Sequence, residues 1–264
     1  MSEWKASIGR VVLLPAVPMS SSPLSALDLY RRVWGREPDN FRRQPNPLAP
    51  SVAQGKRGGV TAGCLVHPTR IDFSLTPPPE TTQLSLPLIE DTGQLHSELV
   101  KIIDVIGQDA VSISVVRVAL NVQFLALKPS PVEANKALTA IIPSQYGVRI
   151  TNEEDFIFQI NRPYTSREVE SIKMNSLTKW SVDRVQVLTM AIPMGGVRAP
   201  ATRASVKPQI EVLIAASVNF DINNMQTETP LSGRQQSSLL REALTAAVQM
   251  EQDIGLNVEG FHNV

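Results

Sequence analysis

At 264 residues with 42% hydrophobic and 19% charged side chains, the chain has the composition of a folded globular protein rather than a disordered one. Its 25 basic and 25 acidic side chains cancel, so no net charge draws the molecule to nucleic acid or to an anionic membrane. The single cysteine, Cys64, excludes an intramolecular disulfide framework and favours a reducing compartment, so we expect a cytoplasmic protein. No apolar run reaches the roughly 18 residues of a membrane-spanning helix, and we expect no membrane partner.

The first predicted elements are a strand and a helix. The apolar run over 8–14 predicts a buried strand that Pro15 ends. A helix follows from about Leu24 to Gly35, with apolar side chains along one face. Between residues 35 and 59, prolines and glycines are frequent and apolar periodicity is almost absent, so we predict a long loop there.

A hairpin, a helix and a long strand are predicted next. The apolar runs 60–66 and 70–76 are separated by three residues, which is typical of two paired strands. Residues 90–106 carry apolar side chains at helical spacing and predict a helix. A period of two over 111–127 then predicts one long amphipathic strand.

The remaining elements mix strands with two helices. Pro131 opens a predicted helix to about Ile142, and the last predicted helix begins near Ser232. Between them a polar turn rich in proline and glycine spans residues 193–200. We predict strands over 155–161, 168–174, 180–192 and 209–222.

These elements favour an α+β fold with a mixed, largely antiparallel sheet, because strands and helices do not alternate as in a doubly wound parallel sheet. In chain order they read β-α-β-β-α and then β-α-β-β-β-β-α, which suggests one β-α-β-β-α unit used twice. We therefore predict a single α+β domain over 1–264, with two pseudo-repeats over 1–109 and 110–264. No residue-level repeat accompanies this pattern.

No motif in the sequence identifies a catalytic, cofactor or metal site. Gly55-Lys56-Arg57 resembles part of a phosphate-binding loop but lacks its earlier glycine and its final hydroxyl. Cys64 and His67 have the spacing of half a metal site, yet a zinc site needs three or four ligands, so we expect a buried thiol instead. We accordingly predict no cofactor, and we expect the chain not to be an enzyme, although carboxylates that meet only in space leave a dispersed catalytic site open.

Charge is distributed unevenly along the chain. Residues 1–70 contain ten basic and four acidic side chains, an excess of six that the remainder of the chain balances. The second polar turn adds Arg198, Arg203 and Lys207. A basic, partly aromatic surface could contact phosphates or an acidic protein, whereas pairing with the acidic half of the same molecule is the alternative. The residues that we predict for such a binding surface are Trp34, Arg36, Arg42, Arg43, Lys56 and Arg57.

Two segments resemble a sporadically distributed family of uncharacterised bacterial and archaeal proteins of about 250 residues. One is Val116-Arg117-Val118-Ala119-Leu120-Asn121, and the other ends in Phe220-Asp221-Ile222. The order of elements is similar over most of the chain, although Ala119 replaces a usual glycine and Asn223 an acidic residue. The resemblance implies a fold and a prokaryotic setting but no activity. Its matching polar positions are Arg117, Asn121 and Asp221, for which cross-strand hydrogen bonding and ligand binding are both open.

Three functions follow from these observations as hypotheses. The first is a non-catalytic accessory or immunity-like subunit of a prokaryotic system that binds another protein or a second copy of itself. The second is a nucleic-acid-associated accessory protein that uses the basic loops. The third is an enzyme with a dispersed site, which would require a deep pocket with convergent polar groups.

Overall fold

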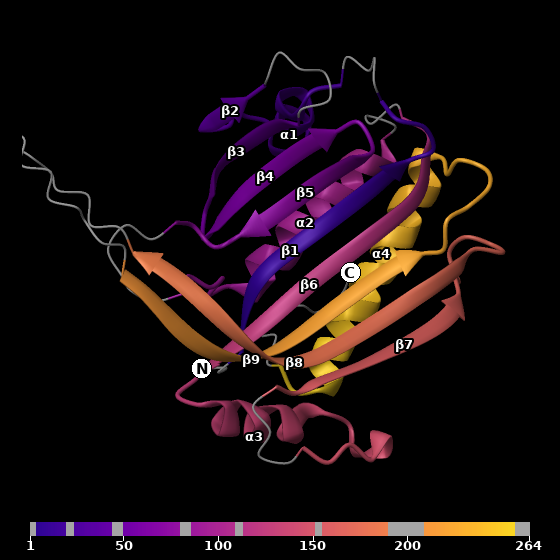
Figure 1. Cartoon of the computed structure of the whole chain (residues 1–264). Coiled ribbons are helices and arrows are strands. Elements are labelled where there is room, and N and C mark those ends of the chain that lie inside the picture. The colour runs from indigo at the N-terminus through magenta and orange to yellow at the C-terminus, as the bar shows by residue number, and fades with distance from the viewer. Residues whose placement is uncertain are drawn as a thin grey trace, which may run out of the picture.

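The described residues form a sheet of nine strands, and every strand pairing among them is antiparallel. The computed structural model describes residues 4–19, 24–43, 50–79, 86–108, 113–150, 155–189 and 209–256. Together with the helices, this sheet confirms the predicted α+β class with a largely antiparallel sheet (Figure 1).

The first half of the chain contributes five strands and two helices: β1 (Lys5–Pro15), α1 (Ala26–Trp34), β2 (Asn40–Arg42), β3 (Ser51–Arg57), β4 (Val60–His67), β5 (Arg70–Thr76) and α2 (Thr92–Gly107). The second half contributes four strands, two α-helices and a 3-10 turn: β6 (Val115–Lys128), α3 (Pro131–Ile141), η1 (Ser144–Tyr146), β7 (Ile157–Thr165), β8 (Lys173–Thr189), β9 (Gln209–Asn224) and α4 (Gly233–Asp253). Across the sheet the strands lie in the order β2-β3-β4-β5-β1-β6-β9-β8-β7.

The predicted long loop over 35–59 is wrong. The structure places β2 and β3 in this segment, and β3 pairs along its whole length with β4. Ala53 and Gly55 of β3 are buried although they are small, because α1 packs over them. Small side chains give no apolar periodicity, so the pairing with β4 was not visible in the sequence.

The predicted strands over 168–174 and 180–192 are one strand, β8, preceded by a turn. The Ser166 hydroxyl accepts hydrogen bonds from the backbone N–H groups of Glu168 and Val169, at 3.2 and 3.0 Å. Ser171 follows with a φ of 66°, which a strand does not contain. This local bonding holds residues 166–172 in a turn between β7 and β8.

In each half of the chain, the strand that comes last in the sequence lies next to the first strand of that half. Going outward from β1, the neighbours are β5, β4 and β3, and going outward from β6 they are β9, β8 and β7. The two halves join where β1 pairs antiparallel with β6. A duplicated unit remains a prediction, since the strand counts of the halves differ by β2.

The core lies between one face of the sheet and its helices. Strand alternation puts Val11, Phe73, Leu120 and Phe220 on this face, and all four are buried. Helices α1, α2 and α4 pack against it, and α3 packs against β6, β8 and β9 at one end (Figure 1). A single cluster of buried hydrophobic residues therefore includes strands from both halves.

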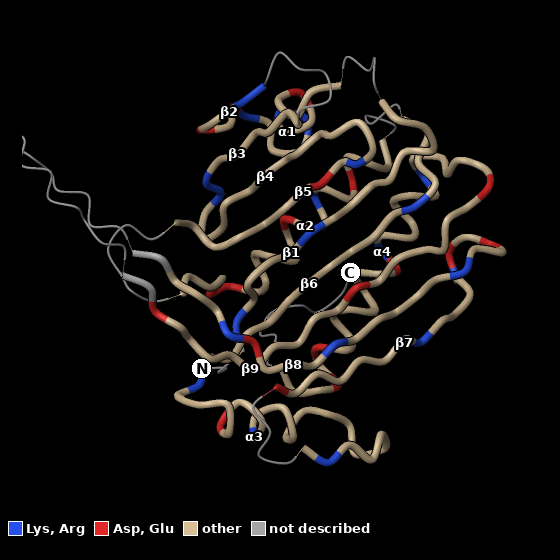
Figure 2. The backbone as a smooth tube through the Cα atoms, in the orientation of Figure 1, with Lys and Arg blue, Asp and Glu red and all other residues tan. Residues whose placement is uncertain are grey.

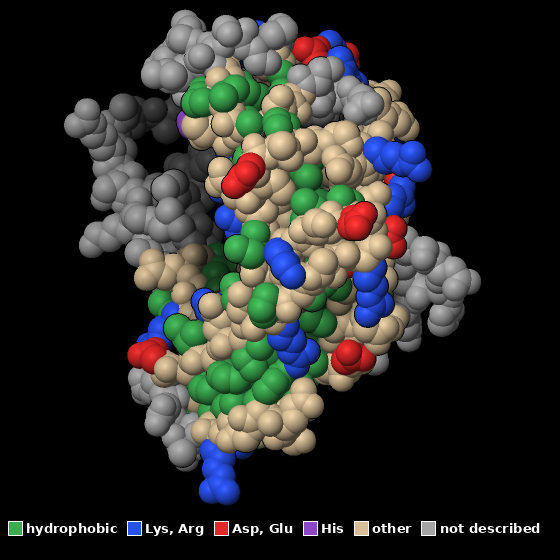
Figure 3. Space-filling view, turned by 90° about the vertical axis from the view of Figure 1, so that its right-hand side faces the viewer, with side chains coloured by type: hydrophobic (Ala, Val, Ile, Leu, Met, Phe, Trp, Pro, Cys, Tyr) green, Lys and Arg blue, Asp and Glu red, His purple; other side chains and the backbone are tan. Residues whose placement is uncertain are grey.

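Hydrophobic side chains also reach the surface beside β7. The rings of Phe158 and Trp180 are stacked with centroids 5.5 Å apart, and Tyr146 lies 5.9 Å from Phe158. Viewed from the β7 side, hydrophobic atoms gather in the lower part of the molecule (Figure 3).

No helix within the described ranges is long and apolar enough to cross a membrane.

Candidate functional site

The sequence-predicted basic residues lie around the β2 edge of the sheet. Arg36, Arg42, Arg43 and Lys56 are all exposed. Figure 2 shows basic positions on β2 and at one end of β3. The structure thus brings these four cations to one end of the molecule.

Two other residues of the predicted surface, Arg57 and Trp34, make internal contacts. The Arg57 guanidinium lies 4.9 Å from the centre of the Tyr30 ring and donates a hydrogen bond of 3.1 Å to the Glu37 carbonyl. The Trp34 indole N–H donates to the Glu98 carboxylate at 2.9 Å. Both side chains therefore stabilise the packing of α1 against its neighbours, which lowers their availability to a ligand.

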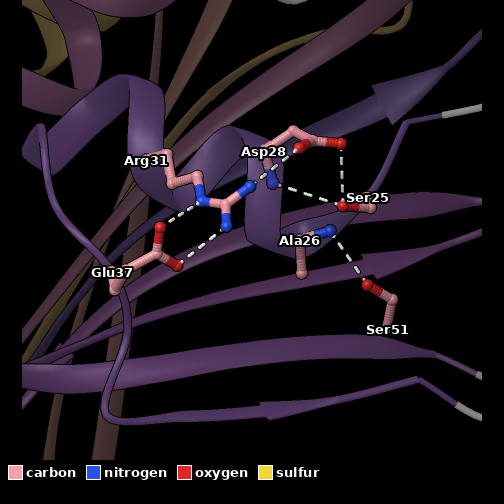
Figure 4. A network of polar contacts seen from close by, with 6 residues as sticks. All are labelled: Ser25, Ala26, Asp28, Arg31, Glu37 and Ser51. Carbon is pink, nitrogen blue, oxygen red and sulfur yellow. Dashed lines mark hydrogen bonds and ion pairs between the residues drawn. The ribbon is translucent and has the colours of Figure 1, made fainter.

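A hydrogen-bond network fixes α1 beside this basic end (Figure 4). The Ser25 hydroxyl caps the helix by accepting from the Asp28 N–H at 3.2 Å, and the Ser51 hydroxyl accepts from the Ala26 N–H at 2.9 Å. Arg31 donates two hydrogen bonds, of 2.8 and 2.9 Å, to the Glu37 carboxylate, which raises the pKa of its guanidinium. These contacts hold the segment after α1 at a defined position relative to β3.

The second basic turn that we predicted, with Arg198, Arg203 and Lys207, lies outside the described residues. Its position relative to β2 and β3 therefore stays a prediction.

We use the name open face for the sheet face opposite α1, α2 and α4. No helix among the residues that the structure describes packs on its centre, and in Figure 1 the strands lie in front of α2 and α4. Its residues are those that alternate with the core positions, such as Arg10 on β1 and Asn121 on β6. The open face is therefore the sheet surface that α1, α2 and α4 leave uncovered.

Amide and hydroxyl side chains form hydrogen bonds across the strands of the open face. On β6, β9, β8 and β7, Arg117 donates to Asn223 at 2.9 Å, Asn175 donates to Asn223 at 3.4 Å, and Asn161 donates to Asn175 at 3.3 Å. Nearer to β1, the Gln123 amide donates to the Ser217 hydroxyl at 2.9 Å. The network orients these polar groups along one surface.

The three polar positions of the family resemblance all belong to this network. Arg117 binds Asn223, whose amide donates to Asp221 at 2.9 Å, and Asn121 donates to Asn219 at 2.8 Å. Arg117 and Asn121 thus make cross-strand hydrogen bonds, whereas Asp221 accepts one from a residue of its own strand, β9. The side chains of Arg117, Asn121 and Asp221 are partly exposed, so their remaining polar atoms are accessible on the open face.

The open face is concave at the end where β8 and β9 extend past the other strands. Asp183 and Val185 of β8 line a cavity of about 480 Å³ together with Ser7 and Thr76, from β1 and β5. Strand β8 is separated from β1 by β9 and β6, so a flat sheet could not bring these residues together. The curvature forms a groove rather than a flat surface.

Three side chains with reactive groups are buried in the core: Cys64, His96 and Glu251. Cys64 points into the core, and burial raises the pKa of its thiol well above the usual range. His96 and Glu251 are fully buried and paired at 3.2 Å between α2 and α4. No group of three or more potential metal-ligating side chains occurs among the described residues.

A cavity of about 790 Å³ lies on the helix side, between α4 and the β7–β8 turn. It contains the Tyr164 hydroxyl, and burial with the nearby Glu242 carboxylate raises its pKa to about 12. Glu242 accepts hydrogen bonds from the Ser166 hydroxyl at 2.5 Å and from the Arg167 N–H at 3.1 Å. A tyrosine that stays protonated and a carboxylate that is hydrogen-bonded to the β7–β8 turn are poorly suited to act as general bases.

No protein-family model matches the chain, and neither a curated protein nor a solved structure shows significant similarity to it. The site therefore has to be judged from its own geometry.

The arrangement of the open face suits binding by hydrogen bonds and charge. Sequence alternation indicated that one side of each strand is polar, but it did not show which strands are neighbours. The spread of the polar surface over both halves of the chain depends on the β1–β6 pairing, for which the sequence has no local signal.

Proposed function

We propose that this protein is a non-catalytic accessory subunit of a prokaryotic system, and that it binds another protein through the open face. The observation that supports this function is a sheet with helices on one face and with hydrogen-bonded polar side chains from several strands on the other. Such a surface offers many oriented donors and acceptors to a partner.

The charges of the open face favour an acidic partner. On its β2–β5 and β1 part, the described cations are Arg10, Arg42, Lys56 and Arg70, and the opposing carboxylate is Asp72. Interfaces with complementary potential gain association rate and specificity. An acidic protein surface would meet this part of the open face.

Charge reversal at one lysine tests the proposal. Lys56→Glu alters the open face at β3, and Lys136→Glu is the matched control on α3, where the lysine side chain is 68% exposed. Each tagged protein is expressed in the native host and purified with what it binds, and the bound proteins are identified by mass spectrometry.

We expect Lys56→Glu to lose a protein that the wild type and Lys136→Glu both retain, and that protein should be acidic where it cross-links to the open face. Equal retention by both variants, with unchanged circular dichroism, would refute the assignment of the interface. If the bound protein is a second copy of the chain, light scattering of the purified protein shows a dimer that Lys56→Glu dissociates.

A nucleic-acid-associated role is the second candidate, because Arg36, Arg42, Arg43 and Lys56 are exposed at one end of the molecule. Phosphate contacts of this kind weaken steeply as salt rises. A titration with single-stranded and duplex DNA at two salt concentrations tests it. Affinity that falls with salt and with Arg42→Gln supports this candidate, and no measurable affinity at low salt eliminates it.

A further inference from the structure

A polar hollow occupies the open face where β1, β3, β4 and β5 lie side by side. Its volume is about 460 Å³, and its polar lining includes Arg10, Gln54, His67, Arg70, Asp72 and Ser74. Gly63 lies at its floor, where an added Cβ would approach the Ser74 hydroxyl to 2.8 Å. The missing side chain at this position keeps the space open.

Within the described ranges, no carboxylate pairs with Arg10 in this hollow. Its Nε is buried and makes no hydrogen bond to any described residue. Its neighbours across the strands are Ser74 on β5 and Asn121 on β6, and neither of them carries a charge. A guanidinium that is partly removed from water without an acceptor favours any ligand that supplies one.

The one carboxylate among the described lining residues is already engaged. Asp72 accepts from the Arg70 Nε at 2.8 Å and from the Arg70 Nη2 at 2.6 Å, through the same oxygen. Because the charge of Arg70 neutralises that of Asp72, the positive charge of Arg10 is not compensated by any described lining residue. The hollow therefore has a net positive charge, and the planar guanidinium of Arg10 is available as a hydrogen-bond donor.

We propose that this hollow binds a carboxylate side chain of an acidic protein segment, with Arg10 as the group that recognises it. This inference rests on the proposed function and names the chemistry of its partner. A guanidinium pairs with a carboxylate through two parallel hydrogen bonds. Nearby, Ser74 and Gln54 add neutral donors. The negative charge of Asp72 favours a carboxylate over a chain of phosphates as the ligand. A single carboxylate can bind Arg10 at a distance from Asp72, whereas a chain of phosphates brings further negative charges close to it.

The probe is a terminally blocked hexapeptide with one glutamate among serines, and the readouts are the Arg10 Nε–H resonance and the backbone N–H resonance of Ser74, which also reports on variants at Arg10. In nitrogen-15 spectra of the full chain, we expect the peptide to shift both resonances in a saturable way. Arg10→Lys keeps the positive charge but cannot donate two parallel hydrogen bonds, so it should weaken peptide binding by about tenfold, the value of one lost charge-assisted hydrogen bond. An open-face lysine outside the hollow, Lys179, supplies the control: Lys179→Gln should leave the affinity within about twofold.

A second variant guards against a trivial loss through misfolding. Asp72→Asn removes the competing negative charge and frees Arg70, so it should strengthen peptide binding severalfold. Unchanged affinity in both Arg10→Lys and Asp72→Asn would overturn the inference. A stronger response of the Arg10 resonance to oligothymidylate than to the peptide would overturn it as well, in favour of phosphate.

Failure of this site and failure of the proposed function give different results. If Arg10→Lys retains the partner that Lys56→Glu loses, the open face is the interface but the hollow is not its carboxylate site. If Lys56→Glu also retains the partner while the peptide still binds the hollow, the hollow is a carboxylate-binding site, but the open face is not the protein interface that we propose.

Discussion

Replacing Phe220 by alanine tests whether the two halves of the chain unfold together. Phe220 on β9 is 1% exposed and packs edge-to-face on Phe124 of β6, with ring centroids 6.2 Å apart. Strand β6 in turn pairs with β1 of the first half. A cavity at Phe220 therefore lies next to the strand that joins the halves.

The expected loss can be estimated from burial. Removing a buried phenylalanine side chain costs about 3–5 kcal/mol of unfolding free energy, which is a large part of the roughly 5–15 kcal/mol that holds a typical domain folded. With an unfolding entropy of about 2.1 cal/mol/K per residue, a loss of about 4 kcal/mol lowers the Tm of a 264-residue domain by about 7 °C.

Tryptophan fluorescence during urea unfolding measures this loss in each half separately. Trp34 lies on α1 in the first half and Trp180 on β8 in the second, so variants in which Trp4 and one of these two are replaced by phenylalanine report on one half. We expect both reporters to show the same lowered midpoint after Phe220→Ala, because the halves share one core. Phe41→Ala, at an edge position that is 43% exposed, should cost less than about 1 kcal/mol.

A shift of the Trp180 midpoint alone would refute the single-domain prediction. It would mean that the second half unfolds independently and that the β1–β6 pairing contributes little.

Three further predictions concern local features. Gly58→Ala should lower the unfolding free energy by about 1 kcal/mol more than Gly147→Ala does. Both glycines have a positive φ, but a Cβ at Gly58 would overlap the Gln94 amide and disturb its hydrogen bonds. Equal losses in urea unfolding would contradict the structure. Cys64 should resist DTNB at pH 8 until urea unfolds the protein, because its raised pKa keeps the thiol protonated, and rapid labelling of the folded chain would show the burial to be wrong. Above about pH 8.5 the thiol ionises in the unfolded chain but not in the folded one, so the unfolding free energy should decline as pH rises further. Ser232→Ala should lower the unfolding free energy by about 1 kcal/mol through the lost cap of α4, whereas Ser232→Asp should retain most of it, and an unaffected alanine variant would argue against the cap.

Local patterns in the sequence determined most of the elements. Apolar spacing predicted α2 and α4, and alternation predicted the strands β5, β6 and β9, because burial on one side imposes a period on any helix or strand. The same reasoning missed β3, whose small residues are covered by α1, and it misplaced a strand in the turn after β7, where Ser166 makes local hydrogen bonds.

The candidate site was decided by the tertiary structure. The sequence showed an excess of cations before residue 70, but it could not show that Arg57 would be bound to Tyr30 and Glu37, or that no carboxylate among the described residues would pair with Arg10. Strand order and curvature determine which side chains meet, and both depend on contacts between residues that lie far apart in the chain. The residue types and their polar faces were therefore set by the sequence alone, whereas their assembly into one open face required the folded sheet.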